Sequence, residues 1–387
     1  MQQPSPDRAA TEIAGKRQMA GLRFEGLDAA RGIGALLVVF GHYNFEMWPE
    51  RHFFTNQSSG YLVVDVFFML SGFVLAHAFF DRPEFRFRDY AAKRIFRLWP
   101  LHMATLMAFA VLMLWNADPV SLKGFALNAM MLHNVGVGDL SMVGFNYPSW
   151  SISVEFVSNL VIGALLIAVP GRWLGNVMLA GICIVSAAIL FATVPHLDRQ
   201  LQNVFGGVNT GLLRGFVSFP LGILAYRFFS AQRGWFEQTS IARTVLIGLA
   251  ILLFFTTLCI PGRSKADIAY LPFYALFITL IACPGPFWMA VFRPFLWLGK
   301  ISFALYMVHM LVIKAMRETG AWPQDYAAGL AAVILVSVLL AAGAHYGVER
   351  PTYDVLNGIW SRRFRPGPRR RPAADWSDEA PPEQRVA

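Results

Sequence analysis

The residues of this chain that are suited to chemistry lie inside apolar runs of membrane-spanning length. Asp28, Arg31 and His42 share the segment GLDAARGIGALLVVFGHYNF. An ionisable side chain inside a span costs roughly 2.5–3.5 kcal/mol on insertion scales, which makes function the default explanation. Arg31 and His42 stand eleven positions apart, so a helix places them about 20° apart on one face and roughly 16 Å apart along its axis. Asp28, one turn before Arg31, is placed to pair with it; the structural alternative is a snorkelling Arg and an interfacial His.

Two further segments combine polar residues with apolar runs. Asp65 interrupts GYLVVDVFFMLSGF, which contains the small residues Ser71 and Gly72 just before its last residue. Small residues permit close helix approach, so Ser71 and Gly72 also fit a packing role. In RDYAAKRIFRLWP, Arg94 and Arg97 lie three positions apart on one helix face. This spacing suits bidentate clamping of phosphates, and it equally suits cationic anchoring at the cytoplasmic interface.

A carboxylate and a second intramembrane histidine complete the set. Glu155 enters a span in YPSWSISVEF, where it is suited to orienting or activating a His or a hydroxyl. In ISFALYMVHM, Ser302, Tyr306 and His309 follow the i, i+4, i+7 spacing of one helix face. Two buried histidines with carboxylates indicate proton handling. That pattern alone does not separate a transferase from a proton-coupled transporter.

The elements that position these residues are membrane helices. The chain of 387 residues is 56% hydrophobic with a mean hydropathy of +0.47, and 15% of it is charged, well below the roughly 25% usual in soluble domains. The net charge of +9 is explained by Lys and Arg in short cytoplasmic loops, so we expect no nucleic acid as a partner. Cys183, Cys259 and Cys283 are widely separated in apolar runs, with no metal or disulfide spacing. We therefore expect no metal site.

The apolar runs predict an all-α, polytopic helical bundle of about ten transmembrane helices. The expected spans are 27–45, 60–80, 98–116, 149–169, 176–194, 207–228, 243–260, 269–284, 295–315 and 326–347. The shorter run 121–135 contains Lys123 and Asn128 and is interpreted as an amphipathic segment in the outer interface. With this assignment most Lys and Arg residues fall on one side, which predicts cytoplasmic N- and C-termini.

Three regions are expected along the chain. Residues 1–23 form a polar cytoplasmic tail, residues 24–356 form the transmembrane domain, and residues 357–387, rich in Arg, Pro and acidic side chains, form a disordered cytoplasmic tail. The membrane lipids are thus the main surroundings of the protein. The oligomeric state is not indicated by any pattern in the sequence.

In this order the segments resemble acyltransferase family 3, the polytopic bacterial acyltransferases that O-acylate glycans and some small molecules. The resemblance rests on six segments spread over about 85% of the chain: LDAARGIGALLVVFGH, GYLVVDVFFMLSGF, RIFRLWP, PSWSISVEF, ISFALYMVH and ERP at 349–351. Trp99 and His102 depart from the family's pattern beside Pro100, and this puts in doubt the contact made there.

The resemblance implies transfer of an acyl group, typically acetyl, from cytoplasmic acyl-CoA to a hydroxyl of a glycan or lipid-linked glycan at the outer face of the bacterial inner membrane. By position, Arg31 and His42 match the family's paired Arg and His, Arg94 and Arg97 match its double-Arg motif, and Glu155 matches its motif Glu. His42 is then the expected general base or transient acyl carrier.

The remaining expected roles follow from this assignment. Arg31, Arg94 and Arg97 are expected to hold CoA phosphates. Asp28 and Glu155 are expected to be catalytic together with His42, with Asp28 orienting Arg31 and Glu155 orienting His42. Asp65, Ser71, Ser302, Tyr306 and His309 are expected around the substrates. No metal or resident cofactor is expected, with acyl-CoA as donor substrate. Two alternatives stay open: a proton-coupled or lipid-linked transporter, and O-acylation of a small cytoplasmic acceptor such as a macrolide.

Overall fold

The protein is a bundle of helices in the computed structural model, which describes residues 23–48, 58–82, 85–136, 145–321 and 323–364. The strands assigned within these ranges are β1 (Asn203–Val204) and β2 (Val208–Asn209), which pair antiparallel. The predicted all-α fold is therefore confirmed. Of the expected N-terminal tail, residues 1–23, all but Arg23 lie outside the described residues.

The helical elements of the first half of the chain are α2 (Glu25–Met47), η1 (Ser59–Leu62), α3 (Val63–Leu75), η2 (Ala76–Phe80), α4 (Phe87–Trp115), α5 (Leu122–Ala129), η4 (Tyr147–Ser149), α6 (Trp150–Ala168) and α7 (Arg172–Thr193). Those of the second half are α8 (Thr210–Ala231), α9 (Arg233–Glu237), α10 (Ile241–Cys259), η5 (Lys265–Ala269), α11 (Tyr270–Ile281), α12 (Gly285–Phe292), η6 (Arg293–Phe295), α13 (Leu296–Glu318), α14 (Tyr326–Ala344), η7 (His345–Glu349) and α15 (Arg350–Phe364). Here η2 and η7 are π-helical turns, and the other η elements are 3-10 turns.

Eight of these helical stretches are long and apolar enough to cross a membrane, which makes the chain a multi-pass membrane protein. They are Ser59–Phe80, Phe87–Trp115, Tyr147–Ala168, Arg172–Thr193, Thr210–Ala231, Ile241–Cys259, Gly285–Glu318 and Tyr326–Phe364. The other two expected spans correspond to α2, whose 23 residues include five acidic, basic or His side chains (Glu25, Asp28, Arg31, His42 and Glu46), and to the 12-residue α11. The 8-residue α5 is about 12 Å long, too short to cross, as expected for 121–135.

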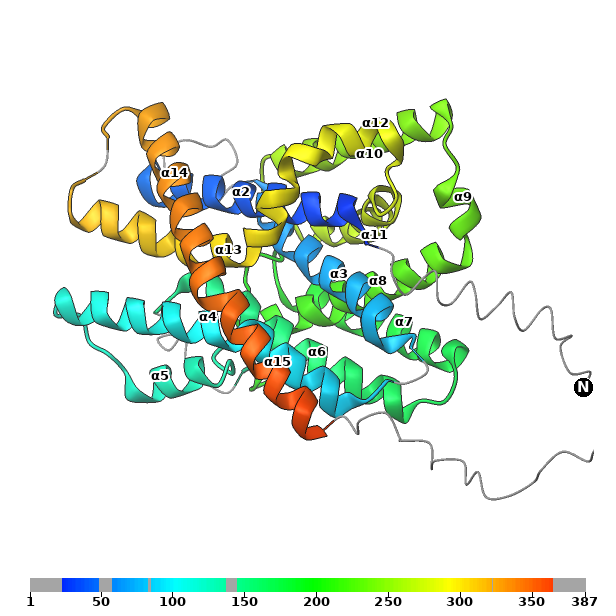
Figure 1. The fold of residues 1–387 in the computed structure, drawn as a ribbon, viewed down its shortest axis with the longest axis horizontal. Coiled ribbons are helices and arrows are strands. Elements are labelled where there is room, and N and C mark those ends of the chain that lie inside the picture. The colour runs from blue at the N-terminus through cyan, green and yellow to red at the C-terminus, as the bar shows by residue number, and fades with distance from the viewer. Residues whose placement is uncertain (1–22, 49–57, 83–84, 137–144, 322, 365–387) are drawn as a thin grey trace, which may run out of the picture.

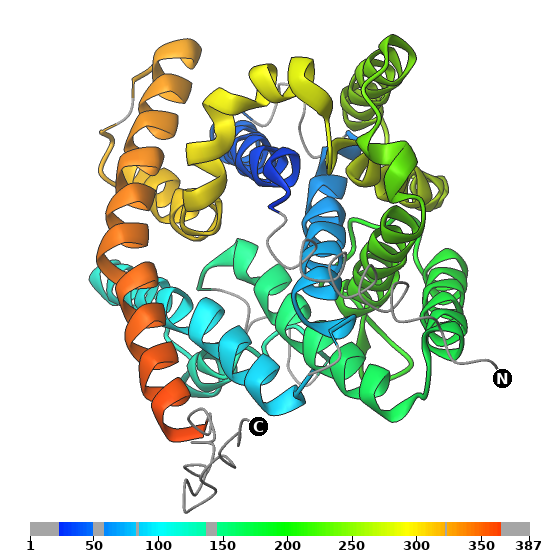
Figure 2. The same cartoon turned by 45° about the vertical axis from the view of Figure 1, so that its right-hand side comes forward.

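Helix α2 occupies the interior of the bundle, with α3, α12 and α13 around it (Figure 2). Glycines set the approach of these helices. A Cβ atom on Gly299 of α13 would lie 2.1 Å from the Asp28 carbonyl oxygen of α2. A Cβ atom on Gly72 of α3 would lie 2.1 Å from the Phe219 carbonyl oxygen of α8. No side chain fits in either place, so Gly72 has the packing role that its segment suggested and Gly299 brings α13 against the start of α2.

The last helices form one continuous rod, α14–η7–α15, that runs beside α4 (Figure 1). The rod corrects the expected start of the disordered tail at residue 357, because α15 remains helical to Phe364. The indole of Trp360 donates a 2.9 Å hydrogen bond to Asp89 of α4, and its ring meets Phe96. These contacts stabilise helix beyond the apolar run. Residues 365–387 lie outside the described part.

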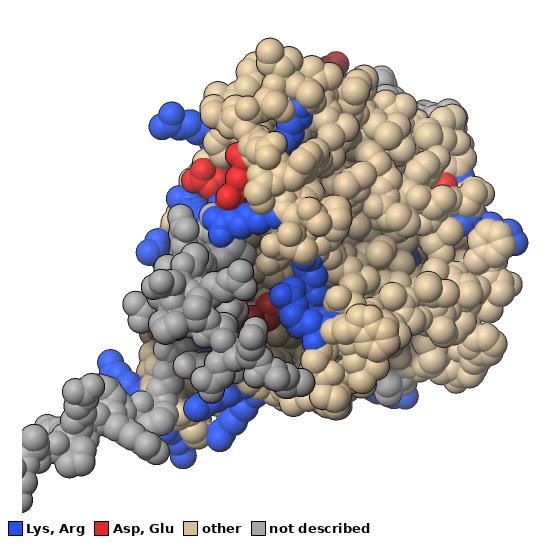
Figure 3. Space-filling model, turned by 90° about the vertical axis from the view of Figure 1, so that its right-hand side faces the viewer, with Lys and Arg blue, Asp and Glu red and all other residues tan. Residues whose placement is uncertain are grey.

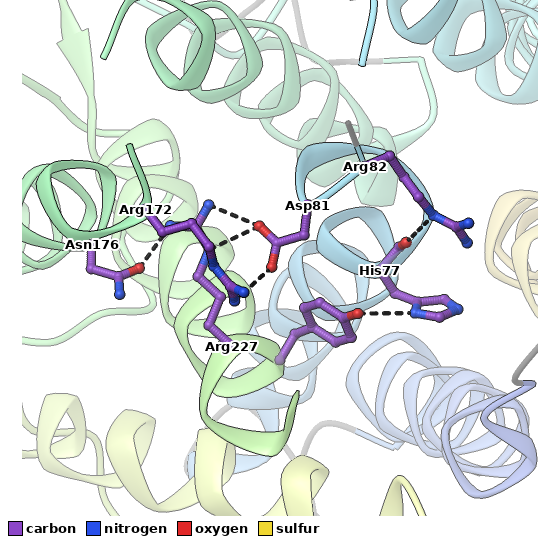
Figure 4. Close-up of polar contacts among 7 residues, drawn as sticks. His77, Asp81, Arg82, Arg172, Asn176 and Arg227 are labelled. Carbon is purple, nitrogen blue, oxygen red and sulfur yellow. Dashed lines mark hydrogen bonds and ion pairs between the residues drawn. The ribbon is translucent and has the colours of Figure 1, made fainter. Parts of the chain in front are cut away.

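The end of the bundle at which α2 begins carries scattered Lys and Arg side chains and one group of acidic ones (Figure 3). Here Asp81, just after η2, joins three elements (Figure 4). It accepts hydrogen bonds from Arg172 of α7 at 3.0 Å and from Arg227 of α8 at 3.0 and 3.1 Å, and Arg227 also donates to Asn176. We call these four residues the Asp81 cluster.

Candidate active site

A cavity of about 360 Å³ opens between α2, α3, α4, α6 and α13, and we call it the inner cavity. Four cations line it: Arg31, Arg94, Arg97 and Lys300. The cavity is also lined by the carboxylates of Asp28 and Glu155 and by the hydroxyls of Ser71 and Ser302. With Tyr306, the cavity brings together eight residues that the sequence singled out on five separate segments. A group of guanidinium and ammonium ions around one cavity is suited to phosphate groups.

Arg31 is oriented from two sides. Its Nη1 lies 3.7 Å from Asp28 Oδ1, which confirms the pairing expected from their spacing. Its Nη2 donates to the Leu70 carbonyl oxygen of α3 at 3.3 Å. Asp28 also accepts a 2.9 Å hydrogen bond from Arg23 Nε. The carboxylate of Asp28 is therefore held between two guanidinium groups.

Arg94 and Arg97 differ in how far their donors are used. Arg97 forms an ion pair with the buried carboxylate of Glu349, which also accepts a 2.9 Å hydrogen bond from His345 Nδ1. Both His345 and Glu349 lie in η7, the π-helical turn between α14 and α15. The buried Nε of Arg94, by contrast, has no hydrogen-bond partner within the described ranges. The Arg94 side chain itself lines the inner cavity, where its guanidinium can meet a ligand.

Glu155 lies at the inner cavity, where its carboxylate accepts a 2.7 Å hydrogen bond from Ser71 Oγ. The expectation that Glu155 orients His42 was therefore wrong. Glu155 is about 8 Å into α6 from Trp150, and it faces α3, whose Ser71 hydroxyl supplies the nearest donor. His42 belongs to a different cavity.

His42 lines a second, smaller cavity of about 120 Å³, the outer cavity. Its Nδ1 lies 3.0 Å from His309 Nε2, while His309 Nδ1 lies 3.2 Å from the Leu305 carbonyl oxygen. A carbonyl only accepts, so neutral His309 carries its proton on Nδ1 and accepts on Nε2. The proton between the two rings then belongs to His42 Nδ1. His42 Nε2 is left as an unprotonated acceptor.

The two cavities meet at Val64 and Tyr306, which line both of them. The Tyr306 hydroxyl is fixed by the Pro148 carbonyl oxygen at 3.0 Å and by Ser151 Oγ at 2.7 Å. The single helix face predicted for α13 thus extends from Ser302 at the inner cavity, through Tyr306 at the junction, to His309 behind His42. The stripe predicted on α2 likewise links Arg31 at one cavity to His42 at the other.

Asp65 is part of a sealed ion pair. Its Oδ2 lies 2.5 Å from Arg214 Nη2, its Oδ1 accepts from Ser218 at 3.0 Å, and both charged side chains are fully buried. The Arg214 guanidinium lies over the rings of Tyr61 and Trp150, at 5.3 and 5.2 Å from their centroids. Asp65 therefore supports the wall of the outer cavity through Arg214.

The rim of the outer cavity is polar and charge-paired. Arg263 forms an ion pair with Asp198, and Gln200 donates a 2.5 Å hydrogen bond to the Tyr147 hydroxyl. Burial raises the pKa of the Asp198 carboxyl, while Arg263 acts in the opposite direction. Paired charges beside aromatic rings form a surface suited to a neutral, hydroxyl-rich ligand.

Sequence reasoning missed several residues of these cavities. Arg214 was visible as a cation inside a span, and Lys300 stands two positions before Ser302. Glu349 belongs to the ERP segment, which supported the family resemblance but was not assigned a contact. The members of the rim, Asp198 and Arg263, come from two loops far apart in sequence, and no local pattern joins them. Within the described ranges no group of three or more His, Cys, Asp or Glu is arranged to hold a metal ion.

Taken together, the fold and the cavities define a multi-pass membrane protein in which a cationic pocket meets an oriented histidine. The profile of the family described as "Acyltransferase domain" matches residues 24–344, and the chain belongs to this family. The protein is accordingly a membrane acyltransferase, as the six segments indicated.

Three relatives extend this comparison. The chain is 26% identical to "Acyltransferase MdmB" of Streptomyces mycarofaciens over 93% of this chain and 96% of that protein. It is 22% identical to "Putative peptidoglycan O-acetyltransferase YrhL" of Bacillus subtilis (strain 168), over 87% of this chain and 56% of the relative. It is also 22% identical to "Peptidoglycan O-acetyltransferase OatA" of Listeria monocytogenes, over 74% of this chain and 49% of the relative. These names support O-acetyl transfer as the activity.

Proposed function

We propose that this protein acts in the bacterial inner membrane, moving an acetyl group from cytoplasmic acyl-CoA to a hydroxyl of an exported or cell-surface glycan. The observation that carries the proposal is the meeting of a cationic cavity with a histidine-bearing cavity at Val64 and Tyr306. Two relatives named as peptidoglycan O-acetyltransferases support a glycan acceptor, free or lipid-linked.

The donor binds from the cytoplasmic side. Arg31, Arg94, Arg97 and Lys300 hold the phosphates of CoA, because a multiply charged anion gains charge-assisted hydrogen bonds from several cations at once. Asp28 keeps the Arg31 guanidinium turned into the cavity. The long pantetheine arm then follows the stripe of α2, passing Glu155 and Ser71, over the roughly 16 Å that separate Arg31 from His42 along the axis.

His42 supplies the base. Its Nε2 takes the proton of the acceptor hydroxyl as the oxygen attacks the thioester carbonyl, and the C–S bond breaks as the C–O bond forms. The imidazolium returns this proton to the CoA thiolate, so the products are the O-acetyl glycan and free CoA. His309 holds His42 in the required tautomer, as the 3.0 Å contact between their rings indicates. The rim of the outer cavity holds the sugar.

Reconstituted protein tests the activity. Proteoliposomes given acetyl-CoA and a glycan acceptor are expected to release CoA thiol and to produce acetylated glycan in equal amounts, and His42→Ala is expected to lower this rate by about 10²–10⁴-fold. His42→Ala with full turnover contradicts the assigned base. Release of CoA that does not depend on the acceptor contradicts the transfer reaction.

The same preparation separates the alternatives. A proton-coupled or lipid-linked transporter moves its substrate across the vesicle wall without consuming acetyl-CoA. An enzyme that acylates a small cytoplasmic acceptor works with donor and acceptor on the same side. The proposed enzyme requires acetyl-CoA at the face bearing the start of α2 and the glycan at the opposite face.

A further inference from the structure

Phe67 of α3 stands between the inner cavity and a third hollow. This hollow, the apolar crevice, has a volume of about 40 Å³ and lies between α2, α3, α10, α11 and α12. Its walls are formed by apolar side chains, among them Ile33, Val66, Ile251, Phe254, Phe277 and Ile281. Phe67 lines both the crevice and the inner cavity. Its ring is therefore the partition between them.

The ring of Phe67 is fixed in this position from both sides. A Cβ atom on Gly34 of α2 would lie 3.0 Å from the Phe67 Cζ atom, so the ring rests directly on the bare backbone of α2. On the other side it meets the Tyr306 ring edge to face, with centroids 6.0 Å apart. A ring held between two helices in this way does not move aside without a change in both contacts.

The partition lies next to the place where the acyl group must react. Val64, one helical turn before Phe67, lines both the inner and the outer cavity, and so does Tyr306. A donor bound by the inner cations reaches His42 only past these two residues. Its acyl carbons beyond the carbonyl carbon are then directed against the Phe67 ring, with the crevice behind it.

We infer that Phe67 restricts the donor to a short acyl chain, and that the apolar crevice is a latent acyl-chain site which the ring closes. This inference rests on the proposed function, because it concerns the acyl group of the same donor. Each added methylene that cannot enter an apolar pocket costs about tenfold or more in kcat/KM. Removal of the ring joins the crevice to the inner cavity and gives a longer chain an apolar place to lie.

The experiment measures kcat/KM for acetyl-, butyryl- and hexanoyl-CoA with one glycan acceptor in proteoliposomes. The unchanged protein is expected to prefer acetyl-CoA over butyryl-CoA, which has two more methylenes, by at least about a hundredfold. Phe67→Ala is expected to raise the hexanoyl-to-acetyl ratio by at least about tenfold, and Phe67→Leu to raise it less. The Leu variant retains an apolar filling of the site, so it gives the same readout if the Ala variant does not fold.

Phe68→Ala is the matched control. Phe68 lines the inner cavity but not the apolar crevice. It packs on Trp150 of α6, with ring centroids 6.2 Å apart. Its removal enlarges the cavity on the other side, and the chain-length ratio is expected to stay within about threefold of that of the unchanged protein.

Three results overturn the inference: an unchanged protein that already uses hexanoyl-CoA well, Phe67 variants that keep the original ratio, or a Phe68 variant that changes the ratio as much as Phe67→Ala does. Each of them still leaves acetyl transfer by the unchanged protein intact. A protein that is inactive with every acyl-CoA instead contradicts the proposed function itself.

Discussion

The Asp81 cluster and the inner cavity both place arginines beside carboxylates, yet they differ in how the donors are used. In the Asp81 cluster, all three guanidinium nitrogens of Arg227 have partners, on Asp81 and Asn176 (Figure 4). Arg227 is only 7% exposed. Each of its three nitrogens is therefore engaged within the fold.

At the inner cavity, by contrast, the arginines have fewer hydrogen-bond partners within the fold. The buried Arg94 Nε has no partner among the described residues, and Arg31 has one 3.3 Å hydrogen bond to the Leu70 carbonyl oxygen and a 3.7 Å contact with Asp28. These side chains face about 360 Å³ of open space. A saturated arginine stabilises helices, whereas an unsaturated one beside a cavity is available for a ligand. The presence of arginine alone does not separate the two cases.

Removal of Arg227 is the strongest test of this difference. Arg227→Leu leaves the buried Asp81 carboxylate with the half-exposed Arg172 as its remaining charged partner, and loss of one member of a buried ion pair costs about 3–5 kcal/mol. We expect a lower thermal unfolding temperature in detergent, and an unchanged KM for acetyl-CoA in the fraction that remains folded. A variant of normal stability with a raised KM would place the Asp81 cluster in the donor site instead.

Arg94→Gln is expected to produce the opposite pattern. Arg94 Nε has no hydrogen-bond partner among the described residues, so the unfolding temperature is expected to change little. Loss of a hydrogen bond to a charged group costs about 1.5–3 kcal/mol, which corresponds to a rise of about 10- to 150-fold in KM for acetyl-CoA. Steady-state kinetics at saturating glycan measures it. An unchanged KM would contradict the phosphate role of Arg94.

The membrane class of the fold was predictable because lipid imposes long apolar runs with polar residues only at sites that use them. The stripes Arg31–His42 and Ser302–Tyr306–His309 were predictable too, since each depends on one helix with a fixed period. The pairing of His42 with His309 depends on how α2 packs against α13. The close approach of these two helices requires the absence of a side chain at Gly299. No spacing within one helix encodes that contact.

The partner of Glu155 was missed for the same reason. Depth in the membrane was inferred from the start of α6, but the direction of the side chain depends on the rotation of α6 against α3, where Ser71 lies. Likewise Glu349 reaches Arg97 from η7, a π-helical turn that alters the facing of the residues after it. Such a change of phase is invisible to a pattern that assumes a regular helix.

Glu349→Gln is expected to have a moderate effect that combines the two patterns. The amide keeps the size of the side chain but removes the charge that holds Arg97, so Arg97 is no longer fixed beside the cavity. We expect a rise of about 3- to 10-fold in KM for acetyl-CoA, equivalent to about 1 kcal/mol, with kcat largely kept. In the proposed mechanism Arg97 contacts the donor directly, and Glu349 is a positioning residue.

A matched control lies one turn further along the same rod. Asp354 faces Arg350 at 3.9 Å with both side chains about two-thirds exposed, at 67% and 66%. Asp354→Asn is expected to leave KM and stability unchanged, because exposed ion pairs contribute little. If both variants raise KM equally, the effect belongs to the net charge of the rod and not to the orientation of Arg97.

Lys300→Gln is expected to give the smallest change. Lys300 is the exposed member of the inner cations and a flexible point charge, so it attracts the phosphates without fixing them. We expect a rise in KM of about threefold or less at low ionic strength, which disappears near 1 M salt because screening then acts over about 3 Å. The effect of Arg94→Gln should persist under that condition, since a buried donor is screened much less. A salt titration of both variants therefore separates attraction by an exposed charge from binding by an unsaturated buried one.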